Sequence, residues 1–124
     1  MGKKIVHVEF PSGDADRAQR FWEGVGGWSF QDAGMPGDYR MFQEGDAGGA
    51  IFPKEGPMAD AQGPTIYFGS DDIEADLAKV RELGGETEEK MPIPSVGWFA
   101  RCKDTEGNPF SLFQSDESVP MPGA

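Results

Sequence analysis

Residues Ile5–Gly27, IVHVEFPSGDADRAQRFWEGVGG, contain a short apolar stretch, an aspartate, a segment with helical periodicity and a closing glycine pair. The same order of features returns in Pro64–Gly85, PTIYFGSDDIEADLAKVRELGG, at an offset of 58 residues. A repeat of this length indicates a duplicated supersecondary unit. We therefore expect two halves built on one plan, which together occupy nearly all of the chain.

Length and composition favour one compact domain rich in turns. A chain of 124 residues is long enough to bury a real core, and 37% hydrophobic with 11% aromatic residues is typical of a globular protein. The 18 glycines and 10 prolines suit many short strands better than long helices. No stretch approaches the roughly 18 apolar residues of a membrane span, so we expect a cytoplasmic protein.

The formal net charge of −11 argues against two classes of partner. A surface this negative repels nucleic acid phosphates and anionic membranes, so neither is expected to bind. It favours a cationic ligand, or it serves solubility alone. The single cysteine, Cys102, excludes an intrachain disulfide and shows no metal-site spacing.

The first strand, Ile5–Phe10, alternates between two faces. One face is uniformly apolar and should lie under a helix, whereas the other is mixed and suits a polar cavity or water. Asp14 is placed to cap the following helix, which should end at Gly26-Gly27. The apolar face consists of Val6, Val8 and Phe10, and the mixed face of Ile5, His7 and Glu9.

The same signals, strand alternation and helix caps, predict the order β-α-β-β-β for each half. Asp71 or Asp72 should cap the second helix, Gly34–Gly37 should form a turn, and Met91–Gly97 should form a loop. We expect a single domain, 1–124, with a first βαβββ unit at 4–53, a linker at 54–63, a second unit at 64–114 and a loose tail at 115–124. Further strands are expected at Trp28–Asp32, Tyr39–Gln43, Gly49–Phe52, Thr65–Gly69, Glu86–Lys90, Trp98–Lys103 and Phe110–Gln114.

This pattern resembles the vicinal oxygen chelate superfamily, which includes glyoxalases, bleomycin-resistance proteins and extradiol dioxygenases. The resemblance implies an α+β fold in which two βαβββ repeats form a barrel-like cleft, with helices on the convex face and a small molecule on the concave one. We also expect a homodimer. The residues that carry the resemblance are His7, Asp14, Phe21-Trp22, Gly26-Gly27-Trp28, Asp72, Gly84-Gly85 and the turn Asp104–Asn108.

Metal-dependent members of that superfamily carry ligands on the first and last strands of both units. Here the matching positions are His7, Thr65, Ser111 and the segment Gly48–Ile51, so one of four ligands remains. The chain has one histidine, which excludes a two-histidine site within one subunit. Glu9 follows His7 on the same face about 6.6 Å along the strand, and these two are a weak metal candidate. We predict no cofactor and no metal, with a divalent ion as the alternative.

Three functions remain open from the sequence. The first is a metal-free protein that binds a small cationic or aromatic molecule in the cleft. The second is a metal-dependent lyase, isomerase or dioxygenase in which His7 or Glu9 acts as base. The third is a non-catalytic interaction module. The predicted ligand-binding residues are His7, Glu9, Thr65, Tyr67, Trp98 and Ser111.

Overall fold

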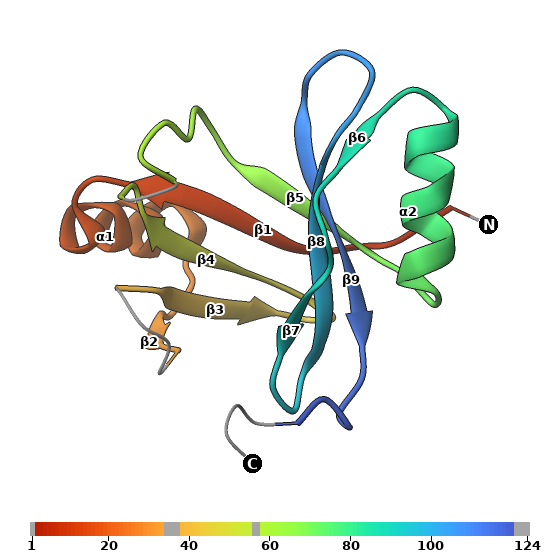
Figure 1. Cartoon of the computed structure of the whole chain (residues 1–124). Coiled ribbons are helices and arrows are strands. Elements are labelled where there is room, and N and C mark those ends of the chain that lie inside the picture. The colour runs from red at the N-terminus through yellow and green to blue at the C-terminus, as the bar shows by residue number, and fades with distance from the viewer. Residues whose placement is uncertain (1, 34–37, 56–57, 121–124) are drawn as a thin grey trace. The chain divides into compact units, whose positions relative to one another are not determined.

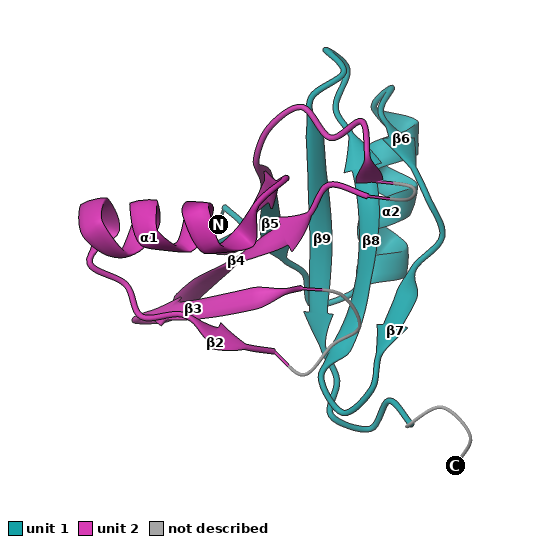
Figure 2. Ribbon diagram, turned by 90° about the vertical axis from the view of Figure 1, so that its left-hand side faces the viewer, with its two compact units in different colours: residues 1–5, 66–124 teal, residues 6–65 magenta. Residues whose placement is uncertain are grey.

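The computed structural model describes residues 2–33, 38–55 and 58–120 and separates into two compact units (Figures 1 and 2). Unit 2 comprises residues 6–65, and unit 1 comprises residues 1–5 with 66–124. The predicted turn Gly34–Gly37 and residues 56–57 of the predicted linker lie outside the described residues. No helix among the described residues is long and apolar enough to cross a membrane.

Unit 2 is a four-stranded sheet with one helix, in the order β-α-β-β-β. Strand β1 pairs in parallel with β4, which pairs antiparallel with β3, and β3 pairs antiparallel with the short β2. The chain thus returns beside its first strand after three further strands. The elements are β1 (Ile5–Ser12), α1 (Ala15–Gly26), β2 (Gln31–Asp32), β3 (Arg40–Glu44) and β4 (Ala47–Pro53).

The caps of α1 are those that the sequence predicts. Asp14 has extended backbone angles, and its carboxylate accepts a hydrogen bond from the amide of Arg17 at 3.1 Å. Gly27 ends the helix with a φ of 72°. This left-handed conformation is unfavourable for residues that have a Cβ atom but is readily adopted by glycine. These two residues therefore fix the length of α1, and both predictions are confirmed.

A row of aromatic rings holds α1 on the sheet of unit 2. Phe10 of β1 stacks on Trp22 of α1 with ring centroids 4.6 Å apart, and Trp22 stacks on Trp28 at 5.7 Å. Trp28 in turn stacks on Phe42 of β3 at 4.0 Å. The predicted apolar face of β1 therefore does lie under the helix, because large rings bury the most apolar surface there.

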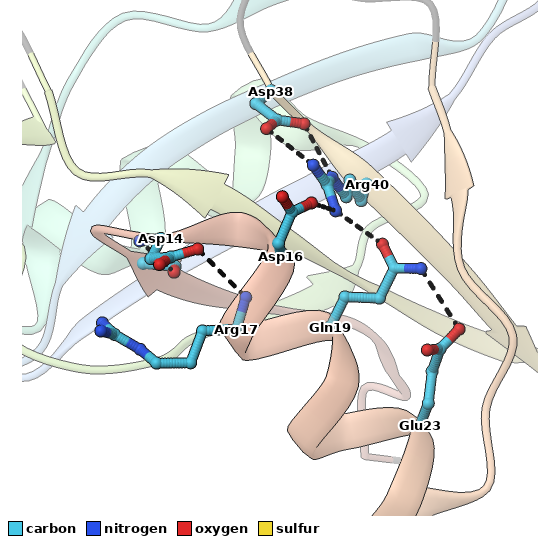
Figure 3. A network of polar contacts seen from close by, with 8 residues as sticks. Asp14, Asp16, Arg17, Gln19, Glu23, Asp38 and Arg40 are labelled. Carbon is cyan, nitrogen blue, oxygen red and sulfur yellow. Dashed lines mark hydrogen bonds and ion pairs between the residues drawn. The ribbon is translucent and has the colours of Figure 1, made fainter.

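A guanidinium fastens α1 to the same sheet (Figure 3). Arg40 donates from Nε and Nη2 to both carboxylate oxygens of Asp38, at 2.8 and 2.9 Å. Its Nη1 reaches Asp16 at 2.8 Å and Gln19 at 2.9 Å, both in α1. Hydrogen bonds with Asp38 and then Asp16 raise the pKa of Arg40, while Arg40 lowers the pKa of Asp38. Arg40 is thus committed to structure.

Unit 1 repeats the same plan with one extra short strand. Strand β5 pairs in parallel with β9, and β9 pairs antiparallel with β8. Both β6 and β7 pair with the other side of β8. The elements are β5 (Thr65–Gly69), α2 (Ile73–Glu82), β6 (Glu86–Thr87), β7 (Met91–Ile93), β8 (Gly97–Lys103) and β9 (Pro109–Ser115).

The core of unit 1 lies between α2 and its sheet. Asp72, rather than Asp71, is the N-cap of α2 and accepts from the amide of Ala75 at 3.1 Å. Gln114 of β9 accepts a second hydrogen bond from the first turn, from the amide of Ile73 at 2.8 Å. The buried residues of this core are Ile73, Leu77, Ala100, Cys102 and Leu112.

The structure corrects four boundary predictions. The strands expected at Trp28–Asp32 and Glu86–Lys90 shorten to two residues each, and the loop expected at Met91–Gly97 contains β7. The tail expected to be loose is anchored in its described part. Val119 is buried, its carbonyl accepts from the amide of Ser95 at 2.9 Å, and the amide of Asp116 donates to Val96 at 2.9 Å.

Gly49 marks a place where two strands and an aromatic ring meet closely. A Cβ added there would lie 2.4 Å from Cε1 of Phe42 and 2.8 Å from the carbonyl oxygen of Val8. We predict that Gly49→Ala lowers the free energy of unfolding by about 1–3 kcal/mol, through overpacking. Urea denaturation measures this, with Gly63→Ala as control because nothing lies within 4 Å of its added Cβ. Equal stability of the two variants would contradict the packing described here.

Asp104 closes the turn before β9 and should make stability depend on pH. Its carboxylate accepts from the side chain of Asn108 and from the amides of Asn108 and Glu106, and these hydrogen bonds lower its pKa. Because the folded pKa lies below the unfolded one, the contribution is present above pH ~4 and is lost as pH falls further. We predict that Asp104→Asn flattens this acid limb, as measured by urea denaturation at a series of pH values. Parallel acid limbs for wild type and Asp104→Asn would contradict this.

Candidate functional site

Two of the predicted site residues lie together on one face of unit 2. Phe10 and Phe42 belong to the aromatic row under α1, so the alternate residues of β1, His7 and Glu9, point to the opposite face of the sheet. We call this the far face of unit 2. The side chains of His7 and Glu9 are 17% and 14% exposed, so both are largely shielded yet still reach the surface.

A third residue joins them. Nε2 of His7 lies 3.3 Å from Oε2 of Glu9 and 3.1 Å from the hydroxyl oxygen of Tyr39. The hydroxyl of Tyr39 also donates to Oε2 of Glu9. One imidazole nitrogen, one carboxylate oxygen and one phenol oxygen thus form a closed triangle, which we call the His7–Glu9–Tyr39 cluster.

Sequence reasoning missed Tyr39 as a site residue. It precedes β3 and lies 30 residues from Glu9, and only the pairing of β3 with β4 and of β4 with β1 brings the two together. The alternation of the strand did contain a signal for Tyr39. Tyr39 and Met41 have the opposite parity to Phe42, so they should share the face of His7. The chain contains two tyrosines, so each was a reasonable candidate for a site residue.

Strand β4 contributes only small residues beside this cluster. Gly48 pairs with His7 and Ala50 pairs with Glu9 in the register of the sheet. Met41 of β3 pairs with Ala50 in turn, so the far face offers a thioether next to the methyl group. The far face of unit 2 therefore combines a polar triangle with small residues from β4 and with the side chains of Met41 and Gln43 from β3.

Unit 1 carries a corresponding row. Tyr67 of β5, Ser111 of β9 and Arg101 of β8 occupy partner positions across three strands, on the face away from α2. Ser111 is fully buried, and its hydroxyl has no hydrogen-bond partner among the described residues. Arg101 Nε lies 3.8 Å from a carboxylate oxygen of Glu88. Thr65, at the start of β5, is the last residue of unit 2.

Trp98 is a correction to the predicted site. It packs against the core beneath α2, so it lies on the other face of β8 from Arg101. Its indole Nε1 donates to Asp116 at 3.2 Å, and the ammonium of Lys90 lies 4.4 Å from its ring centroid. Trp98 is therefore a structural residue of unit 1, because the parity of β8 turns it away from Tyr67 and Ser111.

The donor set of this chain does not fit a divalent metal ion of the kind that the superfamily resemblance implies. In the observed register Ala50 is opposite Glu9 and Ser111 is opposite Tyr67, so both last strands lack a ligating carboxylate. Among the described residues no group of three or more His, Cys, Asp or Glu side chains could hold a metal ion. Divalent zinc takes about three protein ligands in catalytic sites, and we route no chemistry through a metal.

Described residues of unit 1 line two further pockets, and His7 and Glu9 line neither of these two. One, of about 250 Å³, is lined by Met91, Phe99 and Arg101 together with two carboxylates. The other, of about 360 Å³, lies at the edge of α2 and β6 and mixes three glutamates with Arg81 and Lys90. Because a salt bridge and a hydrogen bond already join four of these side chains, the larger pocket is best described as a polar surface groove.

Comparisons with known proteins agree on the family. The profile of the Glyoxalase/Bleomycin resistance protein/Dioxygenase superfamily matches residues 4–112. A glyoxylase-like domain-containing protein from Didymella fabae is 30% identical over 119 residues, covering 88% of this chain and 91% of that protein. CFP32 of Mycobacterium bovis, a candidate glyoxylase, is 36% identical over 116 residues, covering 89% of this chain but 43% of its own length.

A solved structure supports the same assignment of fold. The hypothetical protein BH1468 from Bacillus halodurans superposes with a TM-score of 0.77 at 16% identity, covering 98% of this chain and 100% of that one. The α+β fold predicted from the repeat is therefore confirmed as the glyoxalase-like fold. This chain belongs to the glyoxalase/bleomycin resistance protein/dioxygenase superfamily, and it spans less than half of its mycobacterial relative.

Cys102 is not a reactive group of the site. It is 5% exposed in the core of unit 1, and burial raises the pKa of its thiol to about 11, with a smaller contribution from Glu88. We predict that iodoacetamide at pH 8 alkylates the native protein at least about a hundredfold more slowly than the urea-unfolded chain, because little thiolate forms. Mass spectrometry over time measures both rates. Rapid labelling of the native protein would show a thiol accessible in the folded state.

Proposed function

We propose that this protein binds a small molecule on the far face of unit 2, with the His7–Glu9–Tyr39 cluster as its polar anchor and without a native catalytic metal ion. The observation that carries the proposal is the convergence of an imidazole, a carboxylate and a phenol on a face that β4 lines with Gly48 and Ala50. Members of this superfamily bind small ligands, and ligand sites combine a few fixed polar groups with apolar surface.

The charge of the site indicates the class of ligand. Glu9 is a partly exposed carboxylate, and the whole chain carries a formal charge of −11. A ligand with a cationic N–H group would donate to Glu9 and gain from the surrounding negative potential. The thioether of Met41 and the phenol ring of Tyr39 suit an aromatic or apolar body attached to that group. We therefore propose an organic cation or an aromatic amine.

Donor chemistry supports the proposal that no metal ion is required. His7 is the chain's one histidine, and Thr65, Ala50 and Ser111 occupy positions where further ligands would be needed. Thr65, Tyr67 and Ser111 stay predicted ligand-binding residues, whereas Trp98 does not. The homodimer also stays a prediction, which light scattering coupled to size-exclusion chromatography tests.

A ligand screen tests the proposal. We expect organic cations or aromatic amines to raise the melting temperature of the metal-depleted protein, because a ligand that binds only the folded state stabilises it. Glu9→Gln should weaken binding of the best compound at least about tenfold, or 1.4 kcal/mol. Calorimetric titration measures the affinity, and Glu44→Gln is the control because Glu44 is exposed and alternates with the far-face residues of β3.

Two outcomes would contradict this proposal. One is an affinity that is the same in wild type, Glu9→Gln and His7→Gln, which would place the ligand elsewhere. The other is binding that appears only after a divalent metal ion is added and disappears with a chelator.

A further inference from the structure

The protons of the His7–Glu9–Tyr39 cluster can be assigned from hydrogen-bond chemistry. A phenol has one proton to donate, and an ionised carboxylate is an acceptor only. The bond between them is charge-assisted and is therefore the strongest use of that proton, which agrees with the donation from Tyr39 to Oε2 of Glu9. With its proton given to Glu9, the Tyr39 oxygen can only accept from His7.

This assignment fixes the state of Nε2 in His7. That nitrogen lies 3.1 Å from the Tyr39 oxygen and 3.3 Å from Oε2 of Glu9, and both atoms act as acceptors toward it. Nε2 must therefore carry a hydrogen, whether the ring is neutral or charged. Its lone pair, the one that would face a cation held between His7 and Glu9, is then not free for coordination.

We propose that Tyr39 determines what this site accepts, by holding Nε2 of His7 and Oε2 of Glu9 in a hydrogen-bonded triangle that favours organic donors over divalent cations. The proposal rests on the function proposed above and explains how the site excludes a metal. A metal ligand must offer a deprotonated lone pair, and here both candidate atoms are engaged with one hydroxyl. An organic ammonium needs no such lone pair on His7, since Glu9 can accept from it beside Tyr39.

Tyr39 is thus a positioning residue with a testable gain of function. In Tyr39→Phe the ring is kept, so the far face stays filled, but the hydroxyl that engages both atoms is removed. His7 can then turn a lone pair toward Glu9, and the two form a chelating pair. We expect Zn²⁺ or Ni²⁺ to bind Tyr39→Phe at least about tenfold more tightly than wild type, a change of the size that outer-shell substitutions produce in metal sites.

The chain provides a matched control. Glu44 of β3 is exposed and alternates with the far-face residues of that strand, so Glu44→Gln should bind either metal as weakly as wild type. Adding His7→Gln to Tyr39→Phe should abolish the gain. Calorimetric titration with Zn²⁺ alone and with Ni²⁺ alone measures all four proteins. Loss of stability cannot mimic the expected result, because a damaged site does not gain affinity that depends on His7.

A second measurement uses the single histidine of the chain. In the two-bond proton–nitrogen correlation spectrum, the only imidazole signals belong to His7, so its protonated nitrogen is assigned directly. We expect a hydrogen on Nε2 in wild type. A neutral ring protonated on Nδ1 alone overturns the proposal, and so does a Tyr39→Phe protein whose metal affinity equals that of wild type. These two results test the role of Tyr39 alone. The ligand-binding proposal is tested separately, by the effect of Glu9→Gln on ligand affinity.

Discussion

The two-residue period of β1 sets the positions of both the aromatic row under α1 and the candidate site. Side chains of a strand alternate between faces. The residues that pack under α1 and the polar residues of the site must therefore occupy alternate positions along the eight residues of β1. Phe10 stacks beneath α1, while His7 and Glu9 are placed on the opposite face by the same backbone. A shift of one residue in the pairing of β1 with β4 would exchange the two sets and remove both the core and the site.

The second unit shows how the duplicated plan has diverged. Each unit pairs its first strand in parallel with its last, and each covers one face with one helix. The row Glu9, Ala50 and Met41 in unit 2 corresponds to Tyr67, Ser111 and Arg101 in unit 1. The backbone positions are shared, but the side chains are chemically different, so the two units do not carry the same polar groups.

Local sequence rules predicted the fold class and the face of β1 that carries His7 and Glu9. Helix caps at Asp14 and Asp72 and the faces of β1 follow from local rules, because alternation and capping involve residues a few positions apart. Local rules did not predict the role of Tyr39, because its contact with Glu9 depends on the register of β3, β4 and β1 together. Trp98 was placed on the wrong side because an aromatic residue in a strand suits either a core or a ligand wall, and only the observed parity of β8 decides.

The metal content of the protein purified without chelators distinguishes a hydrogen-bonding pair from a metal site at His7 and Glu9. Because one phenol hydroxyl and a reduced donor set leave His7 and Glu9 as a hydrogen-bonding pair, elemental analysis should find zinc, iron, manganese and nickel well below one equivalent per chain. The small amounts found should be the same in wild type and in His7→Gln. One full equivalent of any of these metals, lost on substitution of His7, would contradict this expectation.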